Sequence, residues 1–566
     1  MNRLSLVAAS MVLPFATAFA GARRPHADIH IPAVVRNGIN CDWESSFCSD
    51  LWTHKDSWGY YSGHDEPSLA FYSNQPGSGN NLVYNLTIPS EPPTPPAQDG
   101  SGGTDNFQLQ PVFWIGMAMC DTQSAPNYTQ ACTPNSDSNI YNNPDPAASD
   151  YIGRHPGTAD MELQFFAPGW VEGCSPTVWC VELTVDSYSF DNADNRFNNQ
   201  ACRDTIGDEP VNNTYLTFDG IPLFPANPLR VPYGASIFDT NEIFFMFPGD
   251  QVQISFHDTP LGLRVVVYDV TQQYAGFMTA GPQNGFAQVV FNPQGNGCAL
   301  RPYAFHPMYS TSTPATRVTW AAHTFNVAFS GELGHFEYCS AVDANGNCTA
   351  GGDPGVDQNG KPSMTADADD QQCFVPGSPF LPPGDVQIAG CIFNDIEFDG
   401  PSYGLNWPGT ETPPALDMEI HPSSIQFNSP VFFNSSGDPE NYSQVAFETN
   451  LPGIETQSTP ACDTKSGTNC VNPPPGAAFY PIYTTNTANG RCVWQLGGAQ
   501  IPGTTNTFGG DASAEYGPPS AFVFPIPGTN ASVMSYQDFH RMLGSNPCKV
   551  NLSPSAEVGR KAGITE

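Results

Sequence analysis

Glycine and proline limit most strongly what this chain can fold into. The sequence holds 52 Gly and 56 Pro, together 108 of 566 residues. Proline breaks a helix interior and glycine weakens it, so a helical architecture cannot carry this many of both. Aromatic residues nevertheless make up 12% of the chain, which is more than a disordered protein contains. The combination predicts short strands that are joined by long loops.

Short runs rich in β-branched and aromatic residues recur between clusters of turn residues, which is the pattern of strands. Helical patterns are almost absent, and residues 535–545 are the exception. The sequence therefore predicts an all-β fold with two or three antiparallel β-sandwich domains, jelly-roll or cupredoxin-like, and long disulfide-stapled loops. The strand-like runs are 81–88, 111–119, 161–167, 178–190, 251–257, 263–270, 324–330 and 429–433.

The chain is too long for a single hydrophobic core, so several domains are expected. Two polar breaks guide the division: residues 89–106 are rich first in Pro and then in Gly, and residues 343–370 are rich in Asp and Gly. We expect a signal peptide at 1–20, an N-terminal segment with the linker at 21–105, a first β-sandwich at 106–230, a cupredoxin-like β-sandwich at 231–340, an Asp/Gly-rich loop region at 341–390, a C-terminal β-rich domain at 391–548 and a flexible tail at 549–566.

The first twenty residues have the features of a secretory signal peptide. Arg3 precedes an apolar run, and the small-x-small ending Ala18-Phe19-Ala20 predicts cleavage after Ala20. No later apolar run approaches the ~20 residues that span a bilayer. The chain also holds 16 cysteines, an even number that indicates about eight disulfides in a secreted protein, with adjacent pairing as the simplest arrangement. We expect a secreted, extracellular protein.

Eight N-glycosylation sequons predict a glycoprotein if the host is eukaryotic, and their Asn side chains are then expected to face solvent. The acceptor residues are Asn85, Asn127, Asn212, Asn347, Asn434, Asn441, Asn530 and Asn551.

The charge of the chain restricts its partners. Lys and Arg number 19 against 55 Asp and Glu, for a net charge of −36. Nucleic acid is excluded because its binding requires cationic side chains against phosphates. Anionic membrane surfaces are disfavoured for the same reason. A neutral polysaccharide, a surface protein or a cation such as calcium remains as a partner, and solubility in an acidic medium is the alternative explanation of the charge.

Paired carboxylates are the first candidate for chemistry. Alternate residues of a strand share one face and lie ~6–7 Å apart, a spacing close to that of the acid/base pairs of glycosidases. Asp160 and Glu162 form one such pair, and Asp395, Glu397 and Asp399 form a longer ladder. The stretch "DIEFD" at 395–399 resembles, with the residue types permuted, the alternating acidic strand of concanavalin-like glycosidases. That resemblance implies a catalytic role for Asp395, Glu397 and Asp399, and the strand spacing alone makes Asp160 and Glu162 catalytic candidates.

Calcium binding is a second interpretation of the ladder. Asp395, Glu397, Asp399 and Gly400 follow the start of a calcium loop, in which spaced oxygens surround the cation and glycine permits a sharp turn. The glutamate that completes an EF-hand loop is missing, because Asn406 stands at that position. A solvated acidic strand face is a third interpretation, and the sequence leaves all three open.

Histidines form a second group of candidate site residues. Residues 245–339 resemble a cupredoxin sandwich, with a strand that ends in "PGD" and a later "GHFEYC". That resemblance makes His306, His323 and His335 candidate metal ligands. Copper is disfavoured, because the His and Met that should follow Cys339 in a blue-copper site are missing. Histidines that pack or hydrogen-bond within a sandwich are the alternative, and the commoner, explanation of the pattern.

Other catalytic signatures are missing from the sequence, including G-x-S-x-G, H-E-x-x-H, Walker A and G-x-G-x-x-G. The stretches "HPGTADMELQFFAPGW", "YAFHPMYSTST" and "GGAQIPGTTNTFGG" resemble a family of large secreted β-rich proteins of unknown function from fungi and filamentous bacteria. Two functions remain: an extracellular carbohydrate-active enzyme, or a non-catalytic calcium-stabilised protein that binds a wall polysaccharide or a surface partner. Copper redox chemistry is a distant third, and the sequence does not decide whether the protein is an enzyme.

Overall fold

The structure is a computed structural model, and it describes separate segments of the chain between residues 68 and 552. The described segments are 68–73, 77–90, 112–124, 158–168, 177–187, 190–191, 196–207, 210–229, 242–307, 327–331, 339–342, 348–351, 425–450, 483–496, 521–525, 532–543 and 545–552.

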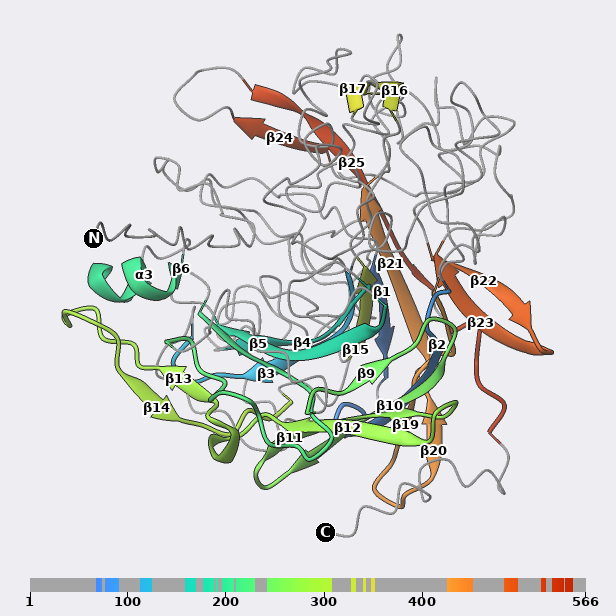
Figure 1. The fold of residues 1–566 in the computed structure, drawn as a ribbon, viewed down its shortest axis with the longest axis horizontal. Coiled ribbons are helices and arrows are strands. Elements are labelled where there is room, and N and C mark those ends of the chain that lie inside the picture. Colours follow the sequence, from blue (N-terminus) through green and yellow to red (C-terminus); the bar gives the residue numbers. More distant parts are fainter. Residues whose placement is uncertain are drawn as a thin grey trace, which may run out of the picture.

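Ten strands of the described segments form an antiparallel sheet, here called sheet 1 (Figure 1). Its order is β24, β25, β21, β1, β15, β3, β4, β5 and β8, and β9 pairs with β5. Its strands are β1 (Ser68–Tyr72), β3 (Val112–Cys120), β4 (Thr158–Phe166), β5 (Trp179–Ser187), β8 (Val211–Tyr215), β9 (Phe245–Met246), β15 (Val327–Gly331), β21 (Gln444–Asn450), β24 (Ala521–Pro525) and β25 (Ser532–Leu543).

A second antiparallel sheet, sheet 2, has nine strands among the described residues. Its order is β12, β11, β10, β2, β18, β23 and β22, with β19 pairing with both β2 and β20. Its strands are β2 (Asn81–Thr87), β10 (Gln251–Thr259), β11 (Gly262–Asp269), β12 (Tyr274–Thr279), β18 (Gln426–Phe427), β19 (Val431–Phe433), β20 (Pro439–Asn441), β22 (Tyr483–Ala488) and β23 (Arg491–Leu496).

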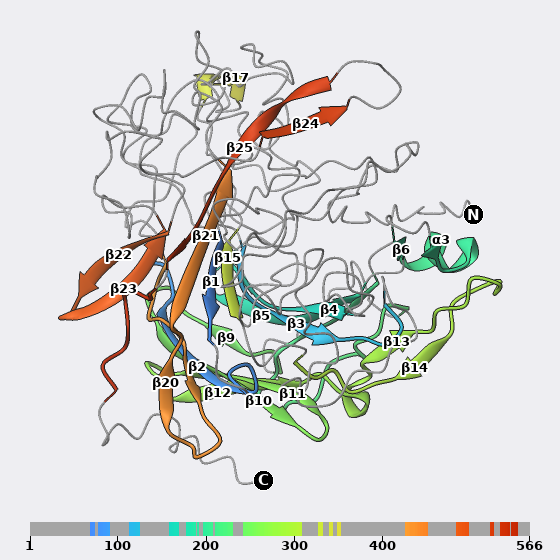
Figure 2. The same cartoon turned by 180° about the vertical axis from the view of Figure 1, so that it is seen from behind.

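The two sheets contribute to one hydrophobic core cluster. Strands β3, β4 and β5 form one layer and β10, β11 and β12 a second layer beside it, as both views show (Figure 1 and Figure 2). Alternate residues of each strand point into the cluster, because successive side chains of a strand leave on opposite faces. In β4 these are Met161, Leu163 and Phe165, and in β11 they include Leu263 and Val265, all fully buried. The remaining alternate residues of β4 therefore face away from the core.

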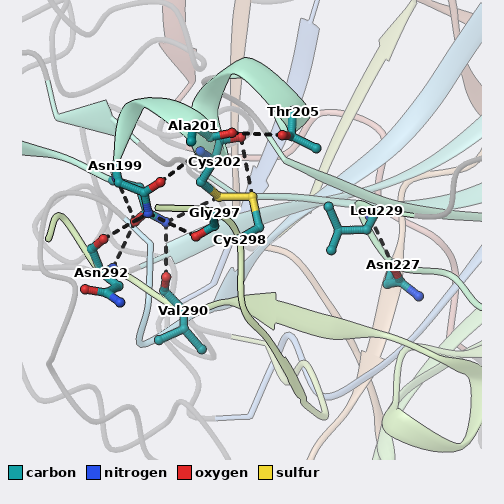
Figure 3. The surroundings of a disulfide bond; sticks show 11 residues. Asn199, Ala201, Cys202, Thr205, Asn227, Leu229, Val290, Asn292, Gly297 and Cys298 are labelled. Carbon is teal, nitrogen blue, oxygen red and sulfur yellow. Dashed lines mark hydrogen bonds between the residues drawn. A yellow bond between two sulfur atoms is a disulfide. The ribbon is translucent and has the colours of Figure 1, made fainter. Parts of the chain in front are cut away.

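Short elements complete the described part of the chain. The helix α3 is joined to the segment after β13 by the disulfide Cys202–Cys298, whose cysteines are 96 residues apart (Figure 3). Asn199 strengthens this junction, because its Oδ1 accepts from the Cys202 N–H at 2.9 Å while its Nδ2 donates to the Gly297 carbonyl at 3.1 Å. The short elements are β6 (Phe190–Asp191), β7 (Arg196–Phe197), α3 (Gln200–Ile206), η4 (Pro282–Asn284), β13 (Ala287–Val289), β14 (Leu300–Pro302), β16 (Cys339–Val342) and β17 (Cys348–Gly351).

A second disulfide, Cys492–Cys548, ties β23 to the segment that follows β25. Both disulfides join cysteines that are consecutive along the chain, which confirms adjacent pairing for these four residues. Cys120 and Cys180 are disulfide-bonded as well. Among the described residues, no helix has the length and apolar character needed to cross a bilayer.

The all-β prediction is confirmed, since the described part consists of antiparallel strands with one short helix and one 3₁₀ turn. The helix-like spacing at 535–545 was misleading. Most of this stretch belongs to β25, which pairs with β21 from Val445↔Leu543 to Asn450↔Asp538. Pairing with neighbouring strands overrides the weak helical pattern, because strand preference depends on such contacts. The domain boundaries stay predictions.

One sequon does not face solvent as expected. Asn212 lies on β8, the last strand in the order of sheet 1, with 1% of its surface exposed. Its Oδ1 accepts from the Ala287 N–H at 2.9 Å, and its Nδ2 lies 3.5 Å from the Val185 carbonyl. The side chain is thus part of the packing between β8, β5 and β13. Asn551, by contrast, is exposed.

Candidate functional site

The face of sheet 1 that points away from the core is polar across β4, β5 and β8. Register places residues in rows across the strands, and residues in a row are neighbours on the same face. One row runs from Trp114 through Gln164 and Glu182 to Tyr215. The next row runs from Gly116 through Glu162 and Thr184 to Asn213, and a third holds Ala118, Asp160, Asp186 and Val211. We call the described side chains Glu162, Gln164, Glu182, Thr184 and Asp186 the carboxylate face.

The local sequence explains why these residues share a face. In β4 the stretch "MELQF" alternates apolar and polar residues, and "VELTV" in β5 does the same. Each apolar residue faces the core, so each polar residue is directed to the opposite side. Because the two strands pair without a shift in register, their polar residues meet in rows.

Two hydrogen bonds fix the carboxylates. Gln164 Nε2 donates to Glu162 Oε2 at 2.6 Å, and Asn213 Nδ2 donates to Glu182 Oε2 at 3.3 Å. Each glutamate therefore accepts from an amide on its own or the neighbouring strand. These amide donors restrict the rotamers of both side chains, which is what a pre-organised pair of reacting groups requires.

Burial changes the proton affinity of one carboxyl. Glu182 keeps part of its surface exposed, but the loss of water around its carboxyl raises its pKa from 4.5 to about 8. Tyr215 lies opposite Glu182, and burial followed by the charge of Glu182 raises the pKa of its phenol well above the usual value. Gln164 and Asp186 are 8% and 9% exposed, so these two neighbours of the glutamates are shielded from bulk water, while Glu162 and Glu182 stay partly exposed. Glu182 is accordingly a protonated carboxylic acid at neutral pH.

The spacing of the two glutamates follows from the register. Glu162 is opposite Thr184, and Glu182 is opposite Gln164, so the two glutamates are diagonal neighbours on β4 and β5. Diagonal neighbours of an antiparallel pair lie about 7–8 Å apart. This spacing refers to the positions of the two residues on the sheet, and it lets a protonated carboxyl and a second carboxylate reach opposite sides of one bond.

Of the sequence-predicted pair, Glu162 belongs to the carboxylate face, and for Asp160 the structure describes only the backbone position. Asp160 and Glu162 are alternate residues of β4, as predicted, and Asp160 lies opposite Asp186 in the register. Glu182 was missed by the sequence reasoning. The alternation of Glu182, Thr184 and Asp186 in "VELTVDS" was the available signal, but the pairing of that strand with β4 cannot be read from the sequence.

The other predicted residues have different outcomes. Asp395, Glu397, Asp399, His323 and His335 lie outside the described residues, so the calcium ladder stays a prediction.

His306 is described, and its ring pairs with a carboxylate. His306 Nδ1 lies 2.7 Å from Asp258 Oδ1, and both side chains are largely buried. The His306 carbonyl accepts from the Cys120 N–H at 2.9 Å, which attaches this segment to the end of β3. Among the described residues no group of three or more His, Cys, Asp or Glu side chains is arranged to hold a metal ion. The pair attaches β10 to the segment that contacts the end of β3, and the metal-ligand role of His306 stays a prediction.

A second buried carboxylate, Asp121, accepts hydrogen bonds at both of its oxygens. Its Oδ2 accepts from the Ser187 hydroxyl at 2.7 Å, and its Oδ1 accepts from the Gln123 N–H at 2.8 Å and from the Gln288 amide. Arg301 in turn donates to the Gln288 side-chain oxygen. Burial raises the pKa of Asp121, and these hydrogen bonds act against that shift. The network connects β3, β5 and β13 and is structural.

Comparison with known proteins adds no functional information. No family model matches the sequence, and no curated protein is similar to it.

Proposed function

We propose that this protein is an extracellular carbohydrate-active enzyme that hydrolyses glycosidic bonds, with Glu182 as general acid and Glu162 as its partner carboxylate. The observation that carries the proposal is the diagonal placement of the two glutamates on one face, with the Glu182 pKa raised to about 8. Two carboxyl groups in environments that separate their protonation are the usual basis of acid/base assignment. We also propose that sheets 1 and 2 form a jelly-roll or cupredoxin-like sandwich, and that the protein is a secreted glycoprotein.

The proposed reaction divides the work between the two carboxyls. Glu182 donates its proton to the glycosidic oxygen as the bond to the anomeric carbon breaks. Glu162 takes a proton from the water molecule that attacks the opposite side of that carbon. The products are two sugar chains, and the active site returns to its starting state by transferring one proton from Glu162 to Glu182 through solvent. This is the division of roles in an inverting glycosidase.

The surroundings of the pair support a sugar substrate. Tyr215 lies opposite Glu182, and a flat ring beside this carboxyl suits the apolar face of a sugar. Gly116, which has no side chain, lies opposite Glu162 on the neighbouring strand β3. The net charge of −36 favours a neutral glycan over an acidic one.

Hydrolysis of a panel of neutral polysaccharides tests the proposal. Purified protein is incubated with cellulose, chitin, β-1,3-glucan, xylan, mannan and starch, and the released reducing ends are measured. We expect the wild type to hydrolyse at least one of them, and Glu182→Gln and Glu162→Gln to lower that rate by about 10²–10⁴-fold. Asp204→Asn serves as the matched control, since Asp204 is an exposed carboxylate on α3. It should retain the wild-type rate.

The stereochemistry of the same reaction gives a second outcome. Because the proposed roles of Glu162 and Glu182 are those of an inverting enzyme, the first product should carry the opposite anomeric configuration to the substrate. Proton NMR of the fresh hydrolysate reports this configuration. Retention would contradict the assignment of Glu162 and Glu182 as an inverting pair, and so would full activity of either glutamine variant.

A further inference from the structure

Two buried aspartates lie where the turn before β10 meets the end of β11. Asp250 directly precedes β10 and is 3% exposed, whereas Asp269 is the last residue of β11 and is fully buried. In the pairing of β10 with β11, Val252 is opposite Asp269, so the two aspartates come from the same end of neighbouring strands. Their side chains are hydrogen-bonding neighbours. Two adjacent buried carboxylates are costly unless their charges are compensated.

Three of the four carboxyl oxygens accept a hydrogen bond. Asp250 Oδ2 accepts from the Phe247 N–H at 2.8 Å, and its Oδ1 accepts from Gln272 Nε2 at 3.0 Å. Asp269 Oδ1 accepts from the Gln272 N–H at 2.9 Å, so Gln272 bridges the two side chains. The fourth oxygen, Asp269 Oδ2, is buried without a hydrogen-bond donor among the described residues. No Lys or Arg of the described segments acts on the Asp269 carboxyl either.

A proton shared between the two carboxyls resolves both problems. It removes one of two adjacent negative charges, and it creates a hydrogen bond in which one carboxyl donates and the other accepts. Asp269 Oδ2 is the oxygen that can carry it, since the other three already accept. Loss of water around the carboxyl raises the pKa of Asp269 from 3.8 to about 6; the Gln272 N–H lowers this pKa, and the Asp250 carboxyl raises it. The proton is therefore bound in an acidic medium and lost near neutrality.

The pair stands where several segments are joined. The Asp250 carbonyl accepts from the Ile88 N–H at 2.8 Å, which attaches the turn before β10 to the end of β2. Tyr274 is opposite Asp269 at the start of β12, and its hydroxyl donates to the Phe245 carbonyl of β9 at 3.1 Å. Since β9 belongs to sheet 1 and β12 to sheet 2, the surroundings of the pair include a contact between the two sheets.

The titratable groups that face Asp269 are Asp250, from the turn before β10, and Tyr274, from β12. Burial, followed by the charges of Asp269 and Asp250, raises the pKa of the Tyr274 phenol, so this hydroxyl stays protonated. The end of β2 is neutral here, with Thr87 opposite Gln251. The two aspartates are therefore the groups that change charge between acidic and neutral pH.

We propose that Asp250 and Asp269 form a proton-dependent latch, in which a carboxyl–carboxylate hydrogen bond holds the turn before β10 against the turn after β11 in an acidic medium. As pH rises the proton leaves to solvent, the two carboxylates repel each other, and the two turns separate more often. The latch is independent of the proposed hydrolysis, because neither aspartate belongs to the carboxylate face.

Hydrogen exchange of backbone amides, measured by mass spectrometry on the intact wild type, tests the latch. The peptides of interest cover the two turns, residues 245–251 and 268–274, and their exchange rates are corrected for the intrinsic effect of pH. We expect their protection to fall by up to about tenfold per pH unit between about pH 4 and 6 and to change little above that, because the closed latch binds a proton that the open one has released.

Asp269→Asn removes the titrating group and keeps the size of the side chain. Its amide can donate to Asp250 at every pH, so the protection of both turns should lose its fall between pH 4 and 6. Asp204→Asn is the matched control, because Asp204 is an exposed aspartate on α3, and it should behave like the wild type.

The wild-type measurement decides the question even if Asp269→Asn does not fold. Wild-type protection that is equal at pH 4 and pH 7 would overturn the latch, and so would an Asp269→Asn variant that keeps the wild-type fall. Calcium that restores the protection of the wild type at pH 7, but not of Asp269→Asn, would show that the pair holds a cation instead of a proton and would also overturn it.

Discussion

At the scale of single residues, burial changes the protonation of a polar side chain. A carboxyl that loses water favours its neutral form, and the folded protein then binds a proton that the unfolded chain has released. Glu182 is in this position, with a pKa of about 8 in the folded state against 4.5 in the unfolded chain. Its effect on stability therefore has a defined sign.

The free energy of unfolding should fall as pH rises from about 5 to 8. In this window the folded state holds the Glu182 proton and the unfolded state does not, so stability decreases with pH by up to about 1.4 kcal/mol per unit. Urea unfolding of the wild type and of Glu182→Gln at several pH values measures the effect. The variant should gain stability relative to the wild type as pH rises. A constant difference between the two curves would contradict the raised pKa.

Glycosylation should discriminate between sequons that look alike in the sequence. Asn212 is buried with both polar atoms of its side chain engaged, whereas Asn551 is exposed. When the chain is produced in a eukaryotic host, we expect a glycan on Asn551 and none on Asn212, because a glycan there cannot fit between β5, β8 and β13. Peptide mass spectrometry after enzymatic deglycosylation measures both sites. Substantial occupancy of Asn212 in folded protein would contradict its placement.

At the scale of elements, tight turns connect the paired strands of two hairpins in sheet 2. The turn between β10 and β11 contains Gly262 with φ +116°, and a Cβ there would lie 2.3 Å from the Ala280 carbonyl oxygen. The turn between β22 and β23 contains Gly490 with φ +73°, and no atom lies within 4 Å of an added Cβ. The two positions therefore share a backbone that disfavours other residues and differ in the space around it.

Alanine at these two glycines should separate strain from steric clash. Gly490→Ala should cost about 1 kcal/mol, because only the left-handed backbone is penalised. Gly262→Ala should cost more than twice that, since the β11–β12 end must also move away from the new methyl group. Urea unfolding of the two variants gives both values. Equal losses would show that the contact with Ala280 is unimportant.

Single elements were the part of the fold that the sequence predicted well. The runs at 81–88, 178–190 and 251–257 correspond to β2, β5 and β10, because alternation and β-branched residues suffice to indicate a half-buried strand. The stretch 535–545 shows the limit of this reasoning. Its pairing with β21 decides its conformation, and that partner is nearly a hundred residues away.

At the scale of the whole molecule, pairing between distant segments creates the candidate site. Sheet 1 places β1 between β15 and β21, and sheet 2 places β2 between β10 and β18. The pattern of a single sequence does not show which strands pair with each other. For this reason Glu162 was predicted as a candidate, while Glu182, twenty residues later, was not. The alternation within each strand was visible, but the row that joins the two glutamates exists only after β4 and β5 pair.

The central claim is that Glu182 acts as a proton donor on a glycan, and the pH dependence of hydrolysis tests it most directly. The rate of reducing-end release is measured for the wild type and Glu182→Gln on the polysaccharide that the wild type cleaves. We predict that the wild-type rate falls as pH rises past about 8, where Glu182 loses its proton, and that the variant is slower by about 10²-fold or more at each lower pH. A variant that hydrolyses at the wild-type rate, with the same alkaline limb, would contradict the account.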